Sequence, residues 1–136
     1  MILKIVTVDD SKTVPYYFNY IFKDIVELNW VGHAYSFMEA KALIKLEKPD
    51  VVIIDIEREP ENGFDLLKFI KRTYRDVAVF MLSNTTDIKY ARKSKLLGAH
   101  YLIDKSFELY NIPNFLMALK SAKNISQKLK QFESFT

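Results

Sequence analysis

The chain alternates between short apolar runs and longer stretches in which apolar residues recur at every third or fourth position. The runs predict strands and the longer stretches predict helices, because strand side chains alternate between two faces and helical ones share a face at that spacing. We expect strands at residues 3–8, 31–35, 51–55, 77–82 and 101–103, each followed by a helix. This strict alternation predicts an α/β fold with a five-stranded parallel sheet and helices on both faces, a doubly wound (βα)5 three-layer sandwich.

Several residues mark where the predicted helices begin and end. Ser11 suits the cap of the first helix, and Pro15 fits only its first turn. Ser36 and Glu39 have the spacing of a capping box at the start of the second helix. Gly98 is expected to close the fourth helix.

The strand at residues 51–55 is the centre of the pattern. Its four β-branched residues predict burial on both faces, and the run ends on a carboxylate, Asp55. Ligands of open α/β sheets bind beyond the carboxyl ends of the strands, so Asp55 lies where chemistry is expected. A polar loop is predicted over residues 56–62, and the third helix then carries Phe64, Leu67 and Ile70.

The composition of the chain indicates a single domain and excludes several kinds of covalent and metal site. A chain of 136 residues suits one domain, and 49% hydrophobic residues are enough for a core. No apolar run approaches the roughly 20 residues of a membrane span, and the chain starts directly with a strand pattern, so we expect a cytoplasmic protein without membrane contact. The absence of cysteine excludes disulfides and thiolate metal sites, and two histidines argue against a histidine zinc site.

The net charge of +3 comes from the end of the chain. Residues 120–136 hold four lysines and one glutamate, which leaves 16 basic and 16 acidic side chains before them. We therefore expect a neutral domain over residues 1–120 and a basic extension of the last helix over residues 121–136. A neutral body predicts no direct binding of nucleic acid by this domain.

Polar residues follow four of the five predicted strands. Asp9 and Asp10 come after the first, and Asp55, Ser83 and Lys105 end the third, fourth and fifth. Taken singly, each is more often a turn, a cap or a solvated charge, but together they meet at one edge of a parallel sheet. Crowded carboxylates repel one another and favour a hard cation such as Mg²⁺, while a lysine and a hydroxyl suit an oxyanion. The set predicts a carboxylate that accepts a phosphoryl group.

On these motifs the chain resembles, over about residues 2–120, the receiver domain of two-component response regulators in the CheY-like superfamily. The resemblance rests on the acidic pair, the hydrophobic run ending in an aspartate, a glycine eight residues later, the hydroxyl, and a Gly-Ala pair leading to the lysine. These are Asp9-Asp10, Asp55, Gly63, Ser83, Gly98-Ala99 and Lys105. It implies a flavodoxin-like, CheY-like fold and a phosphoprotein of a phosphorelay.

The resemblance also implies roles for these residues. Asp55 would accept a phosphoryl group from a phosphohistidine on a histidine kinase or histidine phosphotransfer protein. Asp10, Asp55 and the backbone carbonyl of Glu57 would bind Mg²⁺, and Asp9 would hold the ion largely through water. The chain would pass the signal to an output domain or a downstream protein, and catalyse only its own phosphorylation and dephosphorylation.

Lys105 and Ser83 would carry the response. Lys105 would pair with the phosphoryl oxygens, and Ser83 would swing to bind them and draw the following loop inward. The chain departs from the family where Leu102 replaces the usual switch aromatic, with Tyr101 one residue earlier, and where Ser106 follows the lysine instead of proline. Leu102 is expected either to face the core or to pack on the fourth helix.

Three surface features each remain open to more than one interpretation. The family uses the surface near Tyr16, Tyr17 and Tyr20 to dock the phosphodonor, or one or two of these rings pack on the last helix. A basic group on the fourth helix is a solvated face or a partner surface: Lys89, Arg92, Lys93 and Lys95. The last helix carries an apolar stripe that suits a homodimer seam, a swapped element, a linker or a core helix with a frayed end: Phe115, Leu119, Ala122, Ile125, Leu129 and Phe132.

Other classes of protein fit less well. A flavodoxin-like electron carrier would need a phosphate cradle after the first strand, where Asp9 and Asp10 would repel it. A haloacid-dehalogenase-type phosphatase would place its acid pair after the first strand and add a cap domain. The remaining alternative is a pseudo-receiver, a protein-interaction module that does not take phosphate, although such proteins usually lose an acid or the lysine.

Overall fold

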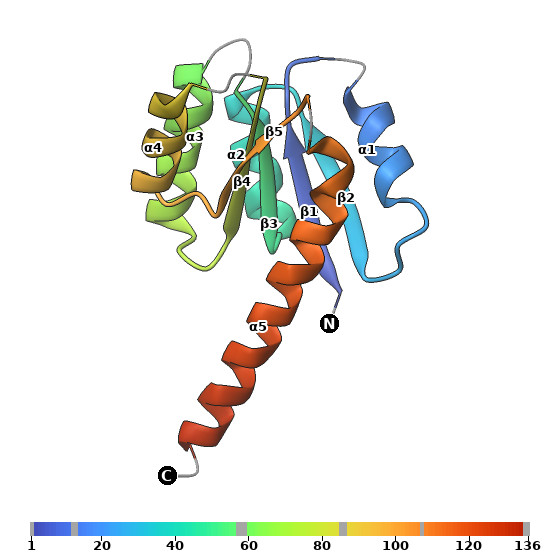
Figure 1. Ribbon diagram of the computed structural model, residues 1–136, viewed down its shortest axis with the longest axis vertical. Coiled ribbons are helices and arrows are strands. Elements are labelled where there is room, and N and C mark those ends of the chain that lie inside the picture. The colour runs from blue at the N-terminus through green and yellow to red at the C-terminus, as the bar shows by residue number, and fades with distance from the viewer. Residues whose placement is uncertain (1, 12–13, 57–59, 85–86, 107, 135–136) are drawn as a thin grey trace.

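Five parallel strands form one sheet, as the sequence predicted, and their order is β2-β1-β3-β4-β5 (Figure 1). The computed structural model describes residues 2–11, 14–56, 60–84, 87–106 and 108–134. The strands are β1 (Leu3–Val8), β2 (Leu28–Ala34), β3 (Val51–Asp55), β4 (Ala78–Ser83) and β5 (Tyr101–Asp104). The helices are α1 (Val14–Phe22), α2 (Phe37–Glu47), α3 (Pro60–Thr73), α4 (Ile88–Leu96), the short η1 (Leu109–Asn111) and α5 (Ile112–Ser134).

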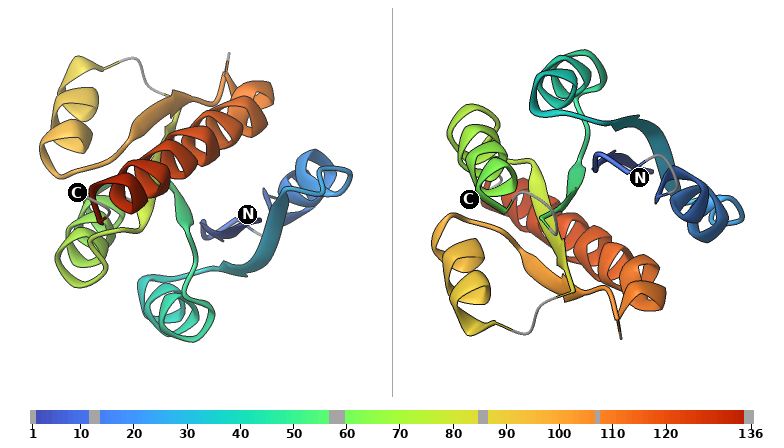
Figure 2. Two further views of the ribbon diagram at one scale, coloured as in Figure 1. Left: turned by 90° about the horizontal axis from the view of Figure 1, so that it is seen from below. Right: turned by 90° about the horizontal axis from the view of Figure 1, so that it is seen from above.

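The sheet is covered on both faces by apolar side chains. One buried cluster joins the sheet to α1 and α5, and the other joins it to α2, α3 and α4. Figure 2 shows α1 and α5 on one side of the strands, with α2 and α3 on the other. Residues 51–54 of β3 are at most 1% exposed, so the predicted burial of this strand on both faces is confirmed.

Two capping predictions are confirmed by hydrogen bonds or backbone angles. The Glu39 backbone N–H donates to Ser36 Oγ at 3.1 Å, and Glu39 Oε2 accepts from the Tyr35 N–H at 2.8 Å. Gly98 follows α4 with a φ of 99°, a left-handed conformation that costs glycine little. The cap predicted at Ser11 stays a prediction, because residues 12–13, between Ser11 and the described start of α1 at Val14, lie outside the described residues.

Two predicted boundaries differ from the structure. The β2 strand begins at Leu28, before the predicted start at residue 31, and its pairing with β1 includes a register shift that a period-2 pattern does not reveal. The α3 helix begins at Pro60, within the stretch predicted as a loop, and proline is well suited to a first helical turn.

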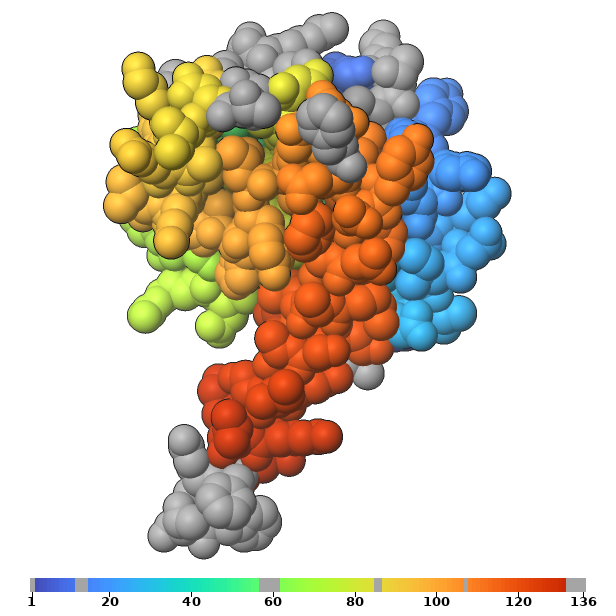
Figure 3. Space-filling view, in the orientation of Figure 1, coloured from blue at the N-terminus to red at the C-terminus, as the bar shows by residue number. Residues whose placement is uncertain are grey.

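The α5 helix packs on the sheet in its first half and projects from the body in its second (Figures 1 and 3). Leu119 is 7% exposed, whereas Ile125 and Leu129 are 59% and 58% exposed. The predicted stripe is therefore a core contact as far as Leu119 and an exposed apolar face at Ile125 and Leu129, and the side chain of Phe132 lies outside the described part of the chain. Within the described ranges, no helix is both long and apolar enough to cross a membrane.

Candidate functional site

The predicted site residues lie at the carboxyl edge of the sheet. Asp9 directly follows β1, Asp55 ends β3, Ser83 ends β4 and Lys105 follows β5. These four strands are consecutive neighbours in the sheet, so the fold brings together residues nearly 100 positions apart in the chain, here Asp9 and Lys105. The assigned roles of these residues stay predictions, since a position at this edge does not by itself establish chemistry.

Asp55 and Lys105 form a buried ion pair. Lys105 Nζ lies 2.5 Å from Asp55 Oδ2, and the two side chains are 17% and 3% exposed. Such a short contact between an ammonium and a carboxylate is a charge-assisted hydrogen bond, which is stronger than a neutral one. The pair holds one carboxylate oxygen of Asp55 against a positive charge, at the end of the buried strand β3.

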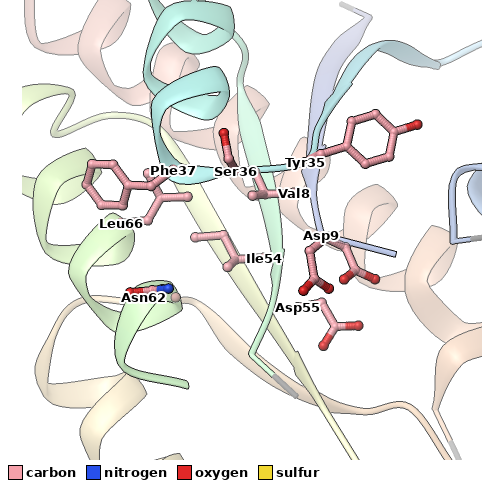
Figure 4. Close-up of a pocket in the computed structure, with 11 residues that line it drawn as sticks. Val8, Asp9, Tyr35, Ser36, Phe37, Ile54, Asp55, Asn62 and Leu66 are labelled. Atoms are coloured by element: carbon pink, nitrogen blue, oxygen red, sulfur yellow. The ribbon is translucent and has the colours of Figure 1, made fainter. Parts of the chain in front are cut away.

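Asp9 is the carboxyl group of the site whose pKa is raised by its surroundings. Burial, reinforced by the negative charge of Asp55, raises the pKa of Asp9 to about 6, although Lys105 opposes the shift. The carboxylates of Asp9 and Asp55 lie close to each other in Figure 4. Asp10 is exposed to solvent. The site thus concentrates more negative charge than the described residues fully balance, which is a donor set that suits a hard divalent cation.

The backbone around Asp9 is held by the neighbouring strand and turn. The Asp9 N–H donates to the Ala34 carbonyl at 3.0 Å, which continues the β1–β2 ladder by one residue. The Ser11 N–H donates to Asp9 Oδ1 at 3.2 Å, so the backbone of Ser11 helps to orient the carboxylate.

Ser83 is buried beside this group. Its side chain is 2% exposed, and its carbonyl accepts the Lys105 N–H at 2.9 Å. The ends of β4 and β5 are therefore joined by a backbone hydrogen bond one residue beyond their ladder. This bond fixes the point at which the Lys105 side chain leaves the sheet.

Two residues that the sequence analysis missed shape the loop that carries Lys105. Asp104 Oδ1 accepts the Ser106 N–H at 2.8 Å, and the Glu108 N–H donates to the Asp104 carbonyl at 2.7 Å. Glu108 Oε1 in return accepts the Asp104 N–H at 3.2 Å. The Asp-x-Ser spacing of an Asx turn was the available signal, because Asp side chains favour bonding the backbone two residues on.

A pocket of about 290 Å³ opens beside the acidic group. Its walls carry the carboxylates at one end and apolar groups of β1, β3, α2 and α3 at the other (Figure 4). The lining residues are Val8, Asp9, Asp10, Tyr35, Ser36, Phe37, Ile54, Asp55, Asn62, Gly63 and Leu66. A Cβ at Gly63 would overlap Ile56 Cγ2, so the glycine lets α3 approach the end of β3 closely.

The predicted Mg²⁺ ligands are not fully assembled in the described part of the chain. Glu57, whose carbonyl was predicted to contribute, lies outside the described residues. Over those ranges, no group of three or more His, Cys, Asp or Glu side chains is arranged to hold a metal ion. The carboxylates present fit Mg²⁺ in chemical type. The observation that supports this fit is that the charge of Asp55, after burial, helps to raise the pKa of Asp9.

The two faces of β5 show where Tyr101 and Leu102, which stands in place of the family's usual switch aromatic, lie. Tyr101 lies on the α5 face, where its ring contacts Phe80 and Phe115 at centroid distances of 5.1 and 4.8 Å. Leu102 faces the opposite layer and packs against the buried cluster there, so the expectation that it faces the core is confirmed, and its packing on α4 stays a prediction. Tyr101 is 38% exposed on the other face.

The tyrosines of α1 divide into two groups. Tyr16 and Tyr20 are 79% and 68% exposed. Tyr17 is half-buried, and burial, followed by electrostatic interaction with Tyr110 of η1, raises the pKa of its hydroxyl. The helix therefore presents two rings to solvent and partly buries the third, and both the docking of a phosphodonor here and the packing of a ring on the last helix stay predictions.

The basic face of α4 is mostly solvated. Lys89, Arg92 and Lys95 are exposed, as one of the two interpretations expected. Lys93 differs, because its ammonium lies 4.6 Å from the centre of the Phe64 ring of α3. This cation–π contact ties α4 to α3 beneath the site.

Comparison with known proteins agrees with this geometry. The family described as the response regulator receiver domain matches residues 5–116. A protein-glutamate methylesterase/protein-glutamine glutaminase of Agrobacterium fabrum is 40% identical over 83 residues, which cover 61% of this chain and 23% of that protein. The sensory transduction protein LytT of Bacillus anthracis is 26% identical over 129 residues, which cover 95% of this chain and 52% of that protein. The chain thus spans about half of the second relative and less of the first.

Solved structures share the fold at low sequence identity. The isolated receiver domain of RcsB from Salmonella enterica serovar Typhimurium, with a phosphomimetic, has a TM-score of 0.80 at 18% identity, covering 89% of this chain and 90% of that one. The non-phosphorylated receiver domain of RcsB from Escherichia coli has a TM-score of 0.81 at 18% identity, covering 90% and 95%. The family match extends over most of the chain, and this chain belongs to the response regulator receiver domain family.

Proposed function

We propose that this chain receives a phosphoryl group on Asp55 and acts as the receiver of a two-component signalling system. The observation that carries the proposal is the buried Asp55–Lys105 pair beside the crowded Asp9 carboxylate. A nucleophilic oxygen, a neutralising ammonium and excess negative charge for a cation are the parts that phosphoryl transfer to a carboxylate requires.

The donor in this proposal is a phosphohistidine on a histidine kinase or a histidine phosphotransfer protein. An Asp55 oxygen forms a bond to phosphorus as the phosphorus–nitrogen bond of the donor breaks. Lys105 would then balance the charge on the phosphoryl oxygens, and Ser83 would donate its hydroxyl hydrogen to one of them. The chain would act as a phosphoacceptor and not as a turnover enzyme on a free substrate.

Mg²⁺ belongs to the same proposal. Asp10, Asp55 and the Glu57 carbonyl would hold the ion, and Asp9 would hold it largely through water. Its chemistry there is charge neutralisation between the carboxylates and the incoming phosphoryl oxygens. The proximity of the Asp9 and Asp55 carboxylates supports this part. Burial contributes most to the raised pKa of Asp9 and the charge of Asp55 adds to it, and a divalent cation between the carboxylates would offset that repulsion.

The surfaces suggest where partners would bind. The exposed rings of Tyr16 and Tyr20 suit docking of the phosphodonor, since tyrosine is enriched at interface hot spots. The exposed faces of α4 and α5 suit an output domain, a downstream protein or a homodimer through these two helices. We propose a cytoplasmic location and no direct contact of this domain with nucleic acid, with the domain boundary near residue 120.

The docking surface has its own test. Tyr16→Ala and Tyr20→Ala should slow phosphoryl transfer from the cognate donor while leaving phosphorylation by a small phosphodonor intact. Tyr17→Phe serves as a control, because it removes the half-buried hydroxyl and keeps the ring. Unchanged transfer in the first two variants would refute this docking site.

The receiver chemistry is tested by intact mass after incubation with Mg²⁺ and acetyl phosphate. We expect one added phosphoryl group in the unmodified protein, and none in Asp55→Asn or after EDTA treatment. A receiver that accepts phosphate only from its kinase would fail this assay but still respond to beryllofluoride. If beryllofluoride with Mg²⁺ also produced no change in the amide spectrum, the alternative of a phosphorylation-independent interaction module would replace the proposal.

A further inference from the structure

A chain of polar side chains crosses from β2 to the acidic pair on the sheet face covered by α1. The Trp30 indole Nε1 lies 3.0 Å from Thr7 Oγ1, and the same oxygen lies 2.6 Å from His33 Nδ1. The other ring nitrogen, His33 Nε2, lies 2.9 Å from the carbonyl oxygen of Asp9. Three side chains from two strands thus form a series of hydrogen bonds, and the last of these bonds is to the Asp9 carbonyl.

The direction of each hydrogen bond follows from what each group is able to donate. The Asp9 carbonyl only accepts, so Nε2 of His33 carries a hydrogen, and the Trp30 indole only donates, so it bonds a lone pair of Thr7 Oγ1. The hydroxyl hydrogen of Thr7 is then directed at Nδ1 of a neutral ring. Every member of the chain is satisfied in this single arrangement, which fixes the tautomer of the imidazole.

The bonded carbonyl belongs to the peptide that links Asp9 to Asp10. The Asp9 N–H donates to the Ala34 carbonyl at 3.0 Å. Two adjacent residues of β2, His33 and Ala34, therefore bond the carbonyl and the N–H of Asp9. Rotation of this peptide plane would move the carboxylates of both residues. A donor placed on the carbonyl therefore controls how the acidic pair faces Asp55.

We propose that His33 is a positioning residue, which holds the Asp9–Asp10 peptide in the orientation that the acidic pair needs to bind a divalent cation. Thr7 and Trp30 act behind it by fixing the ring. The part that concerns the cation rests on the proposed function, whereas the part that concerns the peptide does not.

The composition of β1 supports a role beyond packing. Thr7 is fully buried between apolar neighbours of the strand, where valine would have the same shape without a polar group to satisfy. The ring of His33 also packs edge-on against Tyr35 at a centroid distance of 4.6 Å, and Tyr35 lines the pocket beside the site. The series of hydrogen bonds therefore ends at the acidic pair, and the His33 ring contacts a residue of the pocket wall.

A matched pair of substitutions separates the two bonds of the imidazole. His33→Gln keeps an N–H at the position of Nε2, and so keeps the donor to Asp9. His33→Asn keeps an acceptor at the position of Nδ1 for Thr7 and loses the donor. We expect Mg²⁺ affinity, measured by amide shifts of Asp10, to fall about tenfold in His33→Asn, as for other residues that orient metal ligands, and to stay near that of the unmodified protein in His33→Gln. Equal affinities in the two variants would overturn the proposal.

A second measurement needs no metal. In the unmodified protein the ¹⁵N spectrum of the imidazole should show the tautomer with hydrogen on Nε2, and the Asp9 carbonyl carbon shift should change in His33→Asn but not in His33→Gln. A hydrogen on Nδ1, or an unchanged carbonyl in His33→Asn, would overturn the proposal even if Mg²⁺ bound normally. If the unmodified protein bound no Mg²⁺ while these shifts behaved as expected, the proposed function would fail and the positioning of the peptide would stand.

Thr7 provides the remaining control. Thr7→Val keeps the shape and removes the hydroxyl, whereas Thr7→Ser keeps the hydroxyl. We expect Thr7→Val to weaken Mg²⁺ binding several-fold and Thr7→Ser to restore it. Equal weakening in both variants would mean that packing alone matters at this position and would contradict the role assigned to Thr7.

Discussion

The two edges of the sheet use charge in opposite ways. At the amino edge, charged side chains bond backbone groups that the strands and helices leave over: Asp50 Oδ2 accepts the Lys4 N–H at 2.8 Å, and Lys71 Nζ donates to the Arg75 and Val77 carbonyls at 2.9 and 2.7 Å. At the carboxyl edge, Asp9 and Asp55 face each other, and the pKa of Asp9 rises to about 6. Charged side chains at the amino edge satisfy backbone groups, whereas those at the carboxyl edge place like charges close together.

The difference separates residues that stabilise the chain from residues that serve its site. Like charges held close together reduce stability unless a partner is bound, so such an arrangement is expected only where function requires it. Substitutions at the amino edge should therefore lower stability and leave the site's chemistry intact. Those at the carboxyl edge should change stability in a way that depends on Mg²⁺.

Removing Lys105 should give the largest effect. In Lys105→Met the Asp55 carboxylate, 3% exposed, loses its ammonium partner, and we expect about 3 kcal/mol loss in the free energy of unfolding without Mg²⁺. Urea denaturation at neutral pH measures this loss, and added Mg²⁺ should recover part of it. The double variant with Asp55→Asn should be more stable than Lys105→Met alone, and an equal or lower stability would contradict a charge effect.

Removing Asp50 tests the amino edge. In Asp50→Ala the Lys4 N–H loses its acceptor at the start of β1, so we expect a loss of about 1–2 kcal/mol that Mg²⁺ does not change. Asp50→Asn keeps an acceptor and should lose less. A stability of Asp50→Ala that varied with Mg²⁺ would remove the distinction between the two edges.

Replacing Lys71 should have a smaller effect of the same kind. Lys71→Met keeps much of the aliphatic stem and removes the donor to two carbonyls between α3 and β4, for an expected loss of about 1 kcal/mol. Phosphorylation at Asp55, followed by intact mass, should proceed as in the unmodified chain. A strong loss of phosphorylation would show that the two edges are coupled.

Asp9 should give the smallest change, and one of opposite sign. Its ordinary pKa of 3.8 applies to the unfolded chain, and burial with the charge of Asp55 raises the pKa to about 6 in the folded protein. Between about pH 4 and 6 the folded state therefore binds more protons, and the stability of the metal-free protein falls as pH rises through this window. Asp9→Asn should lack this fall and melt a few degrees higher at pH 7, whereas an unchanged pH profile would contradict the assignment.

Much of the fold was predictable because its signals are local. The apolar runs gave all five strands, the β-branched run at residues 51–54 gave the buried centre, and the order of elements gave a parallel sheet. The position of Asp55 at a strand end is part of the same pattern. The start of α3 at Pro60 was not predicted, because the polar composition of residues 56–62 is typical of a loop, whereas the close packing of α3 at Gly63 against Ile56 is a tertiary contact.

By itself, the sequence determined which elements form, in which order, and which polar residues end the strands, since periodicity and β-branching act over a few residues. Only the tertiary structure decided how those ends interact. The register shift in β2, the Asp55–Lys105 pair and the hydrogen bonds from Trp30 to Asp9 join residues 23 to 50 positions apart. Contacts at that separation depend on strand order and packing, which leave no local pattern in the chain.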